Sequence, residues 1–303
     1  MNTRITLRVN ADVVLALGLA LLAPLMVSFL YEDGSWVSFL LPAVVMVLVG
    51  GAGMLTTRPP SSRTMVYVSN RDVYLSVTLA WVLAALLGWV PFLIERTFGS
   101  LLDSTFEGIS GFTTTGATLL LEIEAETPSI LFWRGMTQWL GGIGIVVLFV
   151  AVAPTIELGA ARLLGAEVSG LDHTRLTPRI VDTAKALLVI YLALTLAGIL
   201  ALLVAGMNLY DAVVHCLTTV ATGGFNSKIA SIGFYDSIAI ETVLIVLMTL
   251  SGVSFSLYYL FYSQRRFDLV LDQELLTYLI IIVASVFFVW GILVLEGDYE
   301  GNL

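Results

Sequence analysis

The chain has 303 residues, of which 58% are apolar and 12% are charged, and its mean hydropathy is +0.96. Soluble domains are about 45–50% apolar and about 25% charged, so this composition excludes an ordinary soluble globular protein. The single cysteine, Cys216, excludes a disulfide scaffold, and the formal net charge of −9 argues against nucleic acid as a partner. The composition therefore predicts an integral membrane protein.

Seven apolar runs are each long enough to cross a bilayer, which takes about 20 residues of helix. Each run is bounded by charged residues or by Gly/Pro clusters. The sequence therefore predicts an all-α polytopic membrane protein with seven transmembrane helices. These helices are expected at about residues 11–31, 36–56, 72–94, 128–153, 181–206, 238–262 and 275–295.

The Lys and Arg residues set the expected orientation, because cytoplasmic loops of membrane proteins carry an excess of them. With the N-terminus inside, cytoplasmic segments carry 11 of the 14 basic residues, and the opposite orientation inverts this bias. We therefore expect a cytoplasmic N-terminus and, since the helix count is odd, a C-terminus outside. The 11 residues are Arg4, Arg8, Arg58, Arg63, Arg71, Arg162, Arg175, Arg179, Lys185, Arg265 and Arg266.

Two segments, residues 100–126 and 207–237, contain apolar stretches too short to cross and lie outside in this topology. Each opens with a helix N-cap residue that is followed three positions later by Asp, at Ser100 and Asn208. Each continues through a short amphipathic stretch into a Thr/Gly segment that disfavours helix. The caps are 108 residues apart, so the chain carries an internal repeat of helix, re-entrant pore helix, Thr-Gly loop and helix.

A Thr-Gly loop at membrane depth has a chemical use. Non-helical backbone is tolerated there only when it is buried in protein or lines a water-filled cavity. Glycine lets successive carbonyl groups point inward and replace the water around a cation, and the negative end of each short helix favours that charge. The pattern predicts a pathway for a monovalent cation, centred on Gly116 and Gly223, which are 107 residues apart; two surface turns are the alternative.

The sequences of these loops resemble a known family. Phe106–Thr118 resembles the first selectivity-filter loop of the Trk/Ktr/HKT cation transporters, in particular of TrkH-type membrane subunits, and Thr219–Phe225 resembles the second. Trp133–Ile145 resembles the helix after the first loop, and Glu167–Gly170 with Thr177–Lys185 resembles the cytoplasmic connection that follows. The resemblance covers nearly the whole chain.

The resemblance implies a K⁺ filter built from backbone carbonyl groups. Glycine rather than serine at Gly116 and Gly223 implies selectivity for K⁺ over Na⁺. Glu107 either helps to hold the filter or is an outer-mouth charge, and Arg134 is expected in a structural hydrogen bond or ion pair. The implied ion-binding residues are Thr113, Thr114, Thr115, Gly116, Ala117, Thr118, Val220, Ala221, Thr222, Gly223, Gly224 and Phe225, with Thr114, Thr115, Ala221 and Thr222 as the K⁺ ligands.

Members of the family have four helix–pore loop–helix repeats around one pore, preceded by two helices. On that plan the chain divides into two N-terminal helices with a cytoplasmic loop (1–71), the first repeat (72–153), a cytoplasmic connection (154–180), the second repeat (181–262) and the first helix of an incomplete third repeat (263–303). We expect a truncated chain. Half of a split transporter and a homodimer supplying four quarters are the alternatives, and the unpaired seventh helix argues against the homodimer.

We therefore expect K⁺ uptake across a prokaryotic plasma membrane, with no enzymatic activity and no cofactor beside the transported K⁺. The resemblance implies a homodimer and a TrkA-like, nucleotide-binding regulatory subunit at the cytoplasmic face. A non-transporting membrane scaffold or half-subunit, a secondary transporter and an Na⁺-permeable member are the alternatives. In this topology 14 of the 23 acidic residues lie outside or in the re-entrant segments, which predicts a cation-attracting vestibule or a solvated acidic surface.

Overall fold

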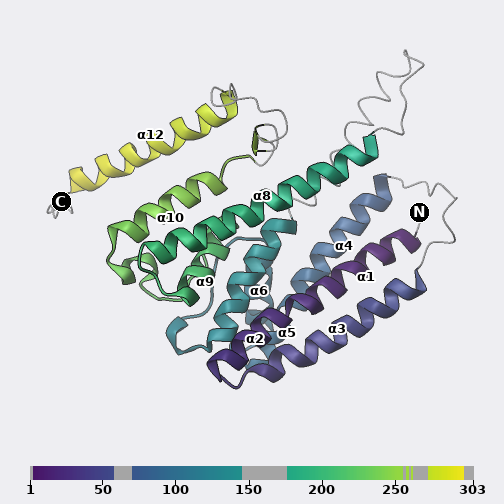
Figure 1. Cartoon of the computed structure of the whole chain (residues 1–303). Coiled ribbons are helices and arrows are strands. Elements are labelled where there is room, and N and C mark those ends of the chain that lie inside the picture. The colour runs from purple at the N-terminus through teal and green to yellow at the C-terminus, as the bar shows by residue number, and fades with distance from the viewer. Residues whose placement is uncertain are drawn as a thin grey trace, which may run out of the picture. The chain divides into compact units, whose positions relative to one another are not determined.

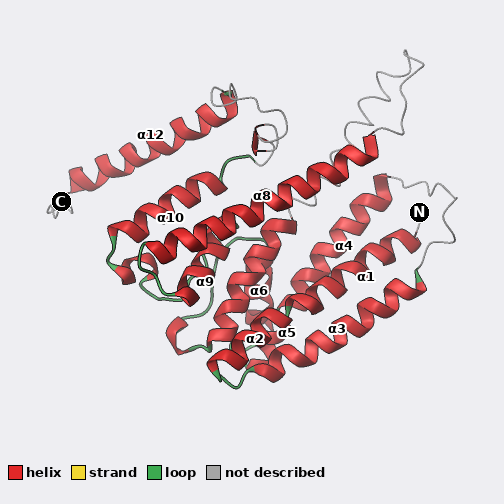
Figure 2. Cartoon of the chain, viewed as in Figure 1, coloured by secondary structure: helices red, strands yellow, loops and turns green. Residues whose placement is uncertain are grey.

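The computed structural model describes residues 3–57, 70–144, 176–254, 257, 258, 261 and 272–296. Within these residues the regular elements are helices and no β-strand occurs (Figure 2). The expectation of a helical protein is therefore confirmed. The chain forms two compact units, Met1–Ser251 and Gly252–Leu303.

Figure 1 shows the described elements in chain order. The first unit contains α1 (Thr3–Ala20), α2 (Leu22–Tyr31), α3 (Trp36–Thr56), α4 (Asn70–Gly88), α5 (Val90–Glu95), α6 (Leu101–Phe112), a helix over residues 128–144, α8 (Leu176–Val204), α9 (Leu209–Val220) and α10 (Ile238–Ser251). Two short 3-10 helices, η1 (Ile123–Ala125) and η3 (Ser231–Tyr235), lie in the connections after α6 and α9. The second unit contains α12 (Gln273–Glu296).

Five stretches of described helix are long and apolar enough to cross a membrane. Each coincides with one of the expected spans, because the apolar runs that predicted them are the same residues. The five stretches are Thr6–Tyr31, Trp36–Thr56, Tyr74–Glu95, Lys185–Val204 and Gln273–Leu295.

The other two expected spans are described only in part. Within 128–153 the helix covers residues 128–144, and within 238–262 α10 is 14 residues long. Residues 145–153 and most of residues 255–262 lie outside the described part of the chain. The expected cytoplasmic connection, 154–180, is described only from Leu176 onward.

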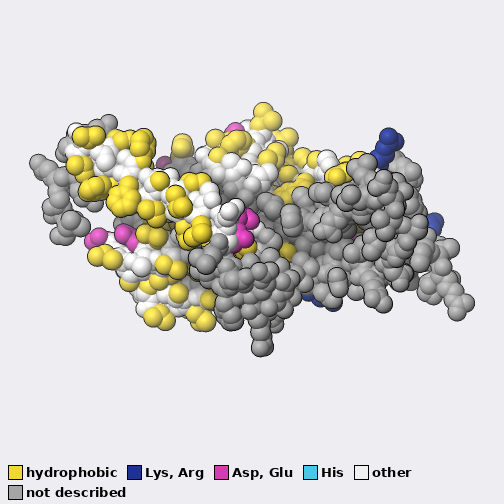
Figure 3. All heavy atoms as spheres, turned by 90° about the horizontal axis from the view of Figure 1, so that it is seen from above, with side chains coloured by type: hydrophobic (Ala, Val, Ile, Leu, Met, Phe, Trp, Pro, Cys, Tyr) yellow, Lys and Arg dark blue, Asp and Glu magenta, His cyan; other side chains and the backbone are white. Residues whose placement is uncertain are grey.

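The candidate spans expose apolar side chains over much of their surface, and Figure 3 shows many hydrophobic side chains on the described part of one face. In α12 no residue of the most apolar 18-residue window is buried, and Phe288 is 70% exposed. A continuous apolar surface is unfavourable in water but suits hydrocarbon, in which a helix satisfies its own backbone hydrogen bonds. These helices are therefore those of a multi-pass membrane protein.

Glycine lets α1 and α3 pack closely beside the first repeat. A Cβ at Gly50 would lie 2.6 Å from the backbone nitrogen of Leu15, so no larger residue fits without a shift. Such contacts are common between membrane helices, where close packing rather than the hydrophobic effect drives association. The core of this pair, which includes Leu21 and Phe39, continues into Phe112 at the end of α6. The N-terminal helices therefore share one hydrophobic core with the end of the first short helix.

Each of the two short helices is held between longer ones. α6 contacts α4, and the helix over residues 128–144 crosses the end of α6, where the rings of Phe112 and Trp133 pack edge to face with centroids 6.4 Å apart. α9 contacts α8 and α10 (Figure 1). The order of long helix, short helix, loop and helix therefore occurs twice, as the internal repeat predicts.

Candidate functional site in two Thr-Gly loops

The two short helices begin at the predicted caps. The side chain of Ser100 accepts a hydrogen bond from the Asp103 backbone nitrogen at 3.1 Å, and that of Asn208 accepts one from the Asp211 nitrogen at 2.9 Å. Each bond satisfies one of the N–H groups that a helix leaves free in its first turn. Both helices are 12 residues long, so the sequence pattern located both starts correctly.

Both short helices also end in the same way. In α6 the Thr115 nitrogen donates to the Ser110 carbonyl at 3.0 Å, and in α9 the Gly223 nitrogen donates to the Thr218 carbonyl at 2.8 Å. The residue before each donor has φ of 55°. This is a Schellman ending, in which the left-handed position is usually Gly. Here it is threonine, a β-branched residue that rarely adopts positive φ, so each loop starts from a strained residue.

The backbone geometry repeats at an offset of 108 residues. The strained threonines are Thr114 and Thr222, and the next residues with positive φ are Gly116 (76°) and Gly224 (90°). Gly224, rather than Gly223, is therefore the structural equivalent of Gly116. The pairing of Gly116 with Gly223 is wrong by one residue, because it matched the letters Thr-Gly, whereas the helix ends set the register.

The two loops nevertheless meet at Gly116 and Gly223. A Cβ at Gly116 would overlap the carbonyl oxygen of Gly223, and a Cβ at Gly223 would overlap the side chain of Gln138. The approach of the loops therefore requires glycine at Gly116, whereas a Cβ at Gly223 would have to displace the side chain of Gln138. At Gly116 the positive φ adds a second requirement.

The expected filter residues differ in their exposure. Thr113, Thr115, Ala117, Thr118, Thr222 and Gly224 are exposed, Thr114, Gly116 and Gly223 are half-buried, and Val220, Ala221 and Phe225 are buried. Val220 is the last residue of α9 and Ala221 is its C-cap, so their side chains lie in the protein interior. The carbonyl of Ala117 accepts a hydrogen bond from the Ser110 hydroxyl at 2.6 Å, which ties the first loop back to α6.

A buried ion pair holds the first loop. Nε of Arg134 lies 2.9 Å from Oε1 of Glu107, and the two side chains are 1% and 0% exposed. The Glu107 carboxylate also accepts hydrogen bonds from the Thr118 hydroxyl at 2.8 Å and from the Leu119 nitrogen at 3.1 Å. Arg134 therefore takes the structural ion-pair role expected for it, and Glu107 holds the loop rather than forming an exposed charge.

The same arginine reaches the second loop. Its guanidinium donates to the Asn226 carbonyl at 3.4 Å and lies over the Phe225 ring, 4.3 Å from the centroid. Planar guanidinium groups suit this combination of carboxylate pairing and ring stacking. Arg134 therefore links the first loop, through Glu107 and Thr118, to the second.

Gln138 is a site residue that the sequence analysis missed. It lies one helical turn after Arg134, is 0% exposed, and its Oε1 accepts a hydrogen bond from the Phe225 nitrogen at 3.0 Å. Its spacing of four residues from Arg134 could have revealed it, because residues four apart lie on the same face of a helix. A polar residue in an apolar membrane helix is a further signal of function.

The second loop has its own polar anchor, at the start of α9. Asp211 accepts hydrogen bonds from the Ser227 hydroxyl at 2.6 Å and from the Asn208 amide at 2.7 Å. Burial alone would raise the pKa of Asp211, but the hydrogen bonds from Ser227, Asn208 and Tyr235 outweigh it and lower the pKa. Nε2 of His215 and the Tyr235 hydroxyl lie 3.2 Å apart beside this group.

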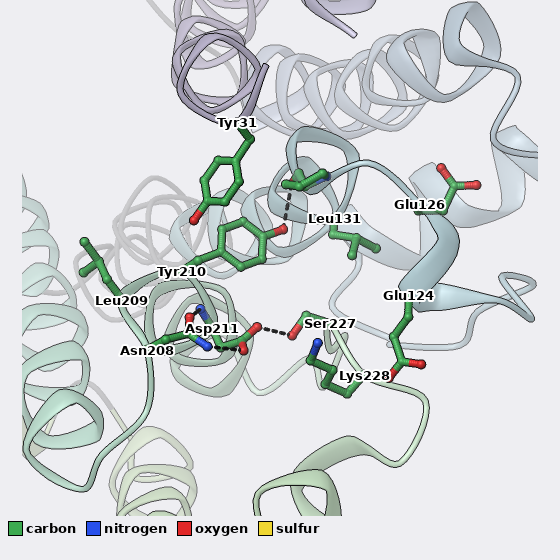
Figure 4. Close-up of a pocket in the computed structure, with 11 residues that line it drawn as sticks. Tyr31, Glu124, Glu126, Leu131, Asn208, Leu209, Tyr210, Asp211, Ser227 and Lys228 are labelled. Carbon is green, nitrogen blue, oxygen red and sulfur yellow. Dashed lines mark hydrogen bonds between the residues drawn. The ribbon is translucent and has the colours of Figure 1, made fainter. Parts of the chain in front are cut away.

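A pocket of about 500 Å³ opens beside this anchor (Figure 4). The Tyr210 hydroxyl donates to the Pro128 carbonyl at 2.7 Å across one side of it, and Glu124 and Glu126 lie on the other. Burial and the nearby Glu95 raise the pKa of Glu126, and Arg134 partly offsets them. Acidic side chains thus gather near the start of α9, and their role as a cation-attracting vestibule remains a prediction.

Comparison with known proteins identifies relatives that match most or all of this chain, including both loops. The chain is 37% identical over 303 residues to the Trk system potassium uptake protein TrkH of Halomonas elongata, covering 99% of this chain and 62% of that protein. It is 36% identical over 267 residues to the protein of the same name in Escherichia coli K12, covering 88% and 54%. The crystal structure of the potassium transporter TrkH from Vibrio parahaemolyticus matches with a TM-score of 0.80 and 32% identity, covering 100% and 61%.

The chain therefore spans only 54–62% of the length of these three proteins. The TrkH family model, described as a cation transport protein, matches residues 43–295, which include both short helices and both Thr-Gly loops. This match extends over most of the chain. The chain belongs to the TrkH family of cation transport proteins.

Proposed function

We propose that this chain takes part in K⁺ uptake across the cell membrane and supplies two quarters of a filter made of backbone carbonyl groups. The observation that carries the proposal is the meeting of two Thr-Gly loops, at Gly116 and Gly223, each at the C-terminal end of a capped helix. Carbonyl groups in such loops replace the hydration shell of a dehydrated cation. The ion is K⁺ by similarity to relatives that are named potassium uptake proteins.

The charges around the loops support a cation. α6 and α9 both end at the loops, and the C-terminal end of a helix carries about half a negative charge. The nearby guanidinium of Arg134 is paired with Glu107. Thr114, Thr115 and Thr222 lie at this end and are proposed as K⁺ ligands together with Ala221.

The proposed topology has seven spans, with α6 and α9 as re-entrant pore helices that enter from outside. It places the N-terminus in the cytoplasm, since 11 of the 14 basic residues then face inward. Non-helical backbone in the two loops is compatible with membrane depth because it lines an ion pathway on one side and is held by buried side chains on the other.

Two of the four filter loops can surround only one side of an ion, so we propose that the other two come from elsewhere. The relatives are longer than this chain, and the missing quarters are proposed to come from a corresponding C-terminal part, in the same or a second polypeptide. By family resemblance we further propose a homodimeric transporter with a nucleotide-binding regulatory subunit at the cytoplasmic connection.

The test is ⁸⁶Rb⁺ uptake in cells that lack their own K⁺ importers. This chain is joined to the C-terminal part of the Halomonas elongata relative that lies beyond the match, which gives a completed chimera. We expect the chimera to take up Rb⁺ and support growth at low K⁺, because it supplies four filter loops. A chimera that reaches the membrane but moves no Rb⁺ would reject K⁺ transport and favour a scaffold role.

Gly116→Ser tests the filter assignment within the chimera. A side chain at this position collides with the Gly223 carbonyl, so the loops must shift and their carbonyl groups should match K⁺ less well, which weakens the discrimination against Na⁺. We expect the Rb⁺ to Na⁺ uptake ratio to fall. An unchanged ratio would show that these loops do not select the ion.

A further inference from the structure

Gln138 lies between the two loops at their point of contact. A Cβ at Gly223 would overlap its side-chain amide, and Nε2 of Gln138 is 3.6 Å from the position of a Cβ at Gly116. The residue is fully buried, so its amide faces protein rather than solvent or lipid. One side chain therefore lies beside a glycine of each loop.

The orientation of this amide is fixed by its hydrogen bond. Oε1 accepts from the Phe225 nitrogen at 3.0 Å, and exchanging the oxygen and nitrogen would place two donors against each other. Nε2 must then point away from Phe225. Within the described part of the chain, Nε2 is buried and has no hydrogen-bond partner.

A buried amide group without a partner is costly and calls for an explanation. Leaving such a donor unsatisfied costs about 1–3 kcal/mol, whereas an apolar side chain of similar volume would avoid that cost. The acceptors available beside Gly116 and Gly223 are the carbonyl groups of the loops themselves. Nε2 lies beside Gly116, so its position suits a donor to a carbonyl group of the first loop.

We propose that Gln138 is a positioning residue that sets ion specificity: Oε1 holds the second loop at Phe225, and Nε2 holds the first loop at Gly116. The length of the Gln138 side chain then fixes the separation of the two loops. The amide is neutral, so it spaces the loops without adding a charge beside the cation, in contrast to Arg134 one turn away, which is charged and paired with Glu107. The proposal rests on the proposed K⁺ filter.

Two substitutions test the acceptor and the donor of the Gln138 amide separately. Gln138→Glu keeps an acceptor for the Phe225 nitrogen and loses the donor, whereas Gln138→Met loses both at similar volume. Thr137→Val is the matched control, because it removes a buried hydroxyl from the same helix that bonds to the helix's own Arg134 carbonyl.

The first readout is hydrogen–deuterium exchange of the chain in lipid nanodiscs with K⁺, which does not require transport. We expect Gln138→Glu to speed exchange several-fold in the peptide of residues 113–119 and to leave the peptide containing Phe225 unchanged. Gln138→Met should speed exchange in both peptides, and Thr137→Val in neither. Wild-type exchange of residues 113–119 in Gln138→Glu would overturn the proposal.

The second readout is the Rb⁺ to Na⁺ uptake ratio of the completed chimera. We expect Gln138→Met to lower the ratio about tenfold, the change that about 1.4 kcal/mol of differential ion stabilisation produces, and Thr137→Val to keep it. A wild-type ratio in Gln138→Met would overturn the inference while the K⁺ filter stands. A wild-type chimera without uptake would instead reject the proposed function, and the exchange experiment would still decide the role of Gln138 in joining the loops.

Discussion

The two Thr-Gly loops share one backbone design but are anchored by different side chains. Both follow a capped 12-residue helix and begin with a threonine at φ of 55°. The first loop is held by the buried pair of Glu107 and Arg134, whereas His215 occupies the position of Glu107 in the second repeat. The second loop has a carboxylate of its own, Asp211, and Arg134 contacts this loop at Asn226 and Phe225. Loop geometry is thus the repeated feature, and its support is specific to each half.

The largest expected effect comes from breaking the buried ion pair. Glu107→Gln or Arg134→Gln should each lower the free energy of unfolding by about 3–5 kcal/mol, because each leaves a buried charge without its partner. The double variant should recover part of the loss. Unfolding of the detergent-solubilised chain measures all three. Single variants as stable as the wild type would show that the first loop does not depend on this pair.

Alanine at the equivalent glycines compares the two loops directly. Gly116→Ala combines positive φ with overlap of the Gly223 carbonyl and should cost about 3 kcal/mol. Gly224→Ala has the same backbone conformation but open space around the added Cβ, so it should cost about 1 kcal/mol. The same unfolding assay measures which of the two substitutions costs more free energy. Equal costs would mean that the loops do not approach each other at Gly116.

The anchor of the second loop should respond to acid. The lowered pKa of Asp211 means that its stabilisation is present above the unfolded value of about 3.9 and is lost as pH falls through the folded pKa. Asp211→Asn should therefore be less stable than the wild type at neutral pH, and the gap should narrow as the pH falls below about 5. Melting temperatures across this range provide the measurement. A gap that widens on acidification would contradict the assigned sign.

The smallest effect concerns the strained threonines. Thr114→Gly and Thr222→Gly relieve a positive φ worth about 1–2 kcal/mol and cost about 0.5–1 kcal/mol in chain entropy, so each should stabilise the chain by about 0–1.5 kcal/mol. The two changes should agree in sign and size in the unfolding assay. Stabilisation at one position and destabilisation at the other would refute the 108-residue equivalence.

The features that sequence predicted here are local ones. The caps at Ser100 and Asn208 depend on residues three positions away, and the spans depend on runs of apolar residues, so both are visible in a single sequence. The ion-pair role of Arg134 was also accessible, because a cation in an apolar segment needs a partner.

The features that sequence missed depend on how distant segments meet. The equivalence of Gly116 with Gly224 follows from the helix ends, whereas the matching letters favoured Gly223. Gln138 gained its role only when its helix packed against both loops, 87 residues from Phe225 in the chain. Both the equivalence of the two glycines and the position of Gln138 between the loops therefore depend on tertiary structure.

The most direct test of the central claim is to locate the ion. Crystals of the completed chimera grown with Rb⁺ would reveal bound ions by anomalous scattering. We expect a peak within coordination distance of backbone oxygens of both loops, beside Gly116 and Gly223. Rb⁺ peaks confined to other parts of the protein, with the two loops ordered as described, would contradict it.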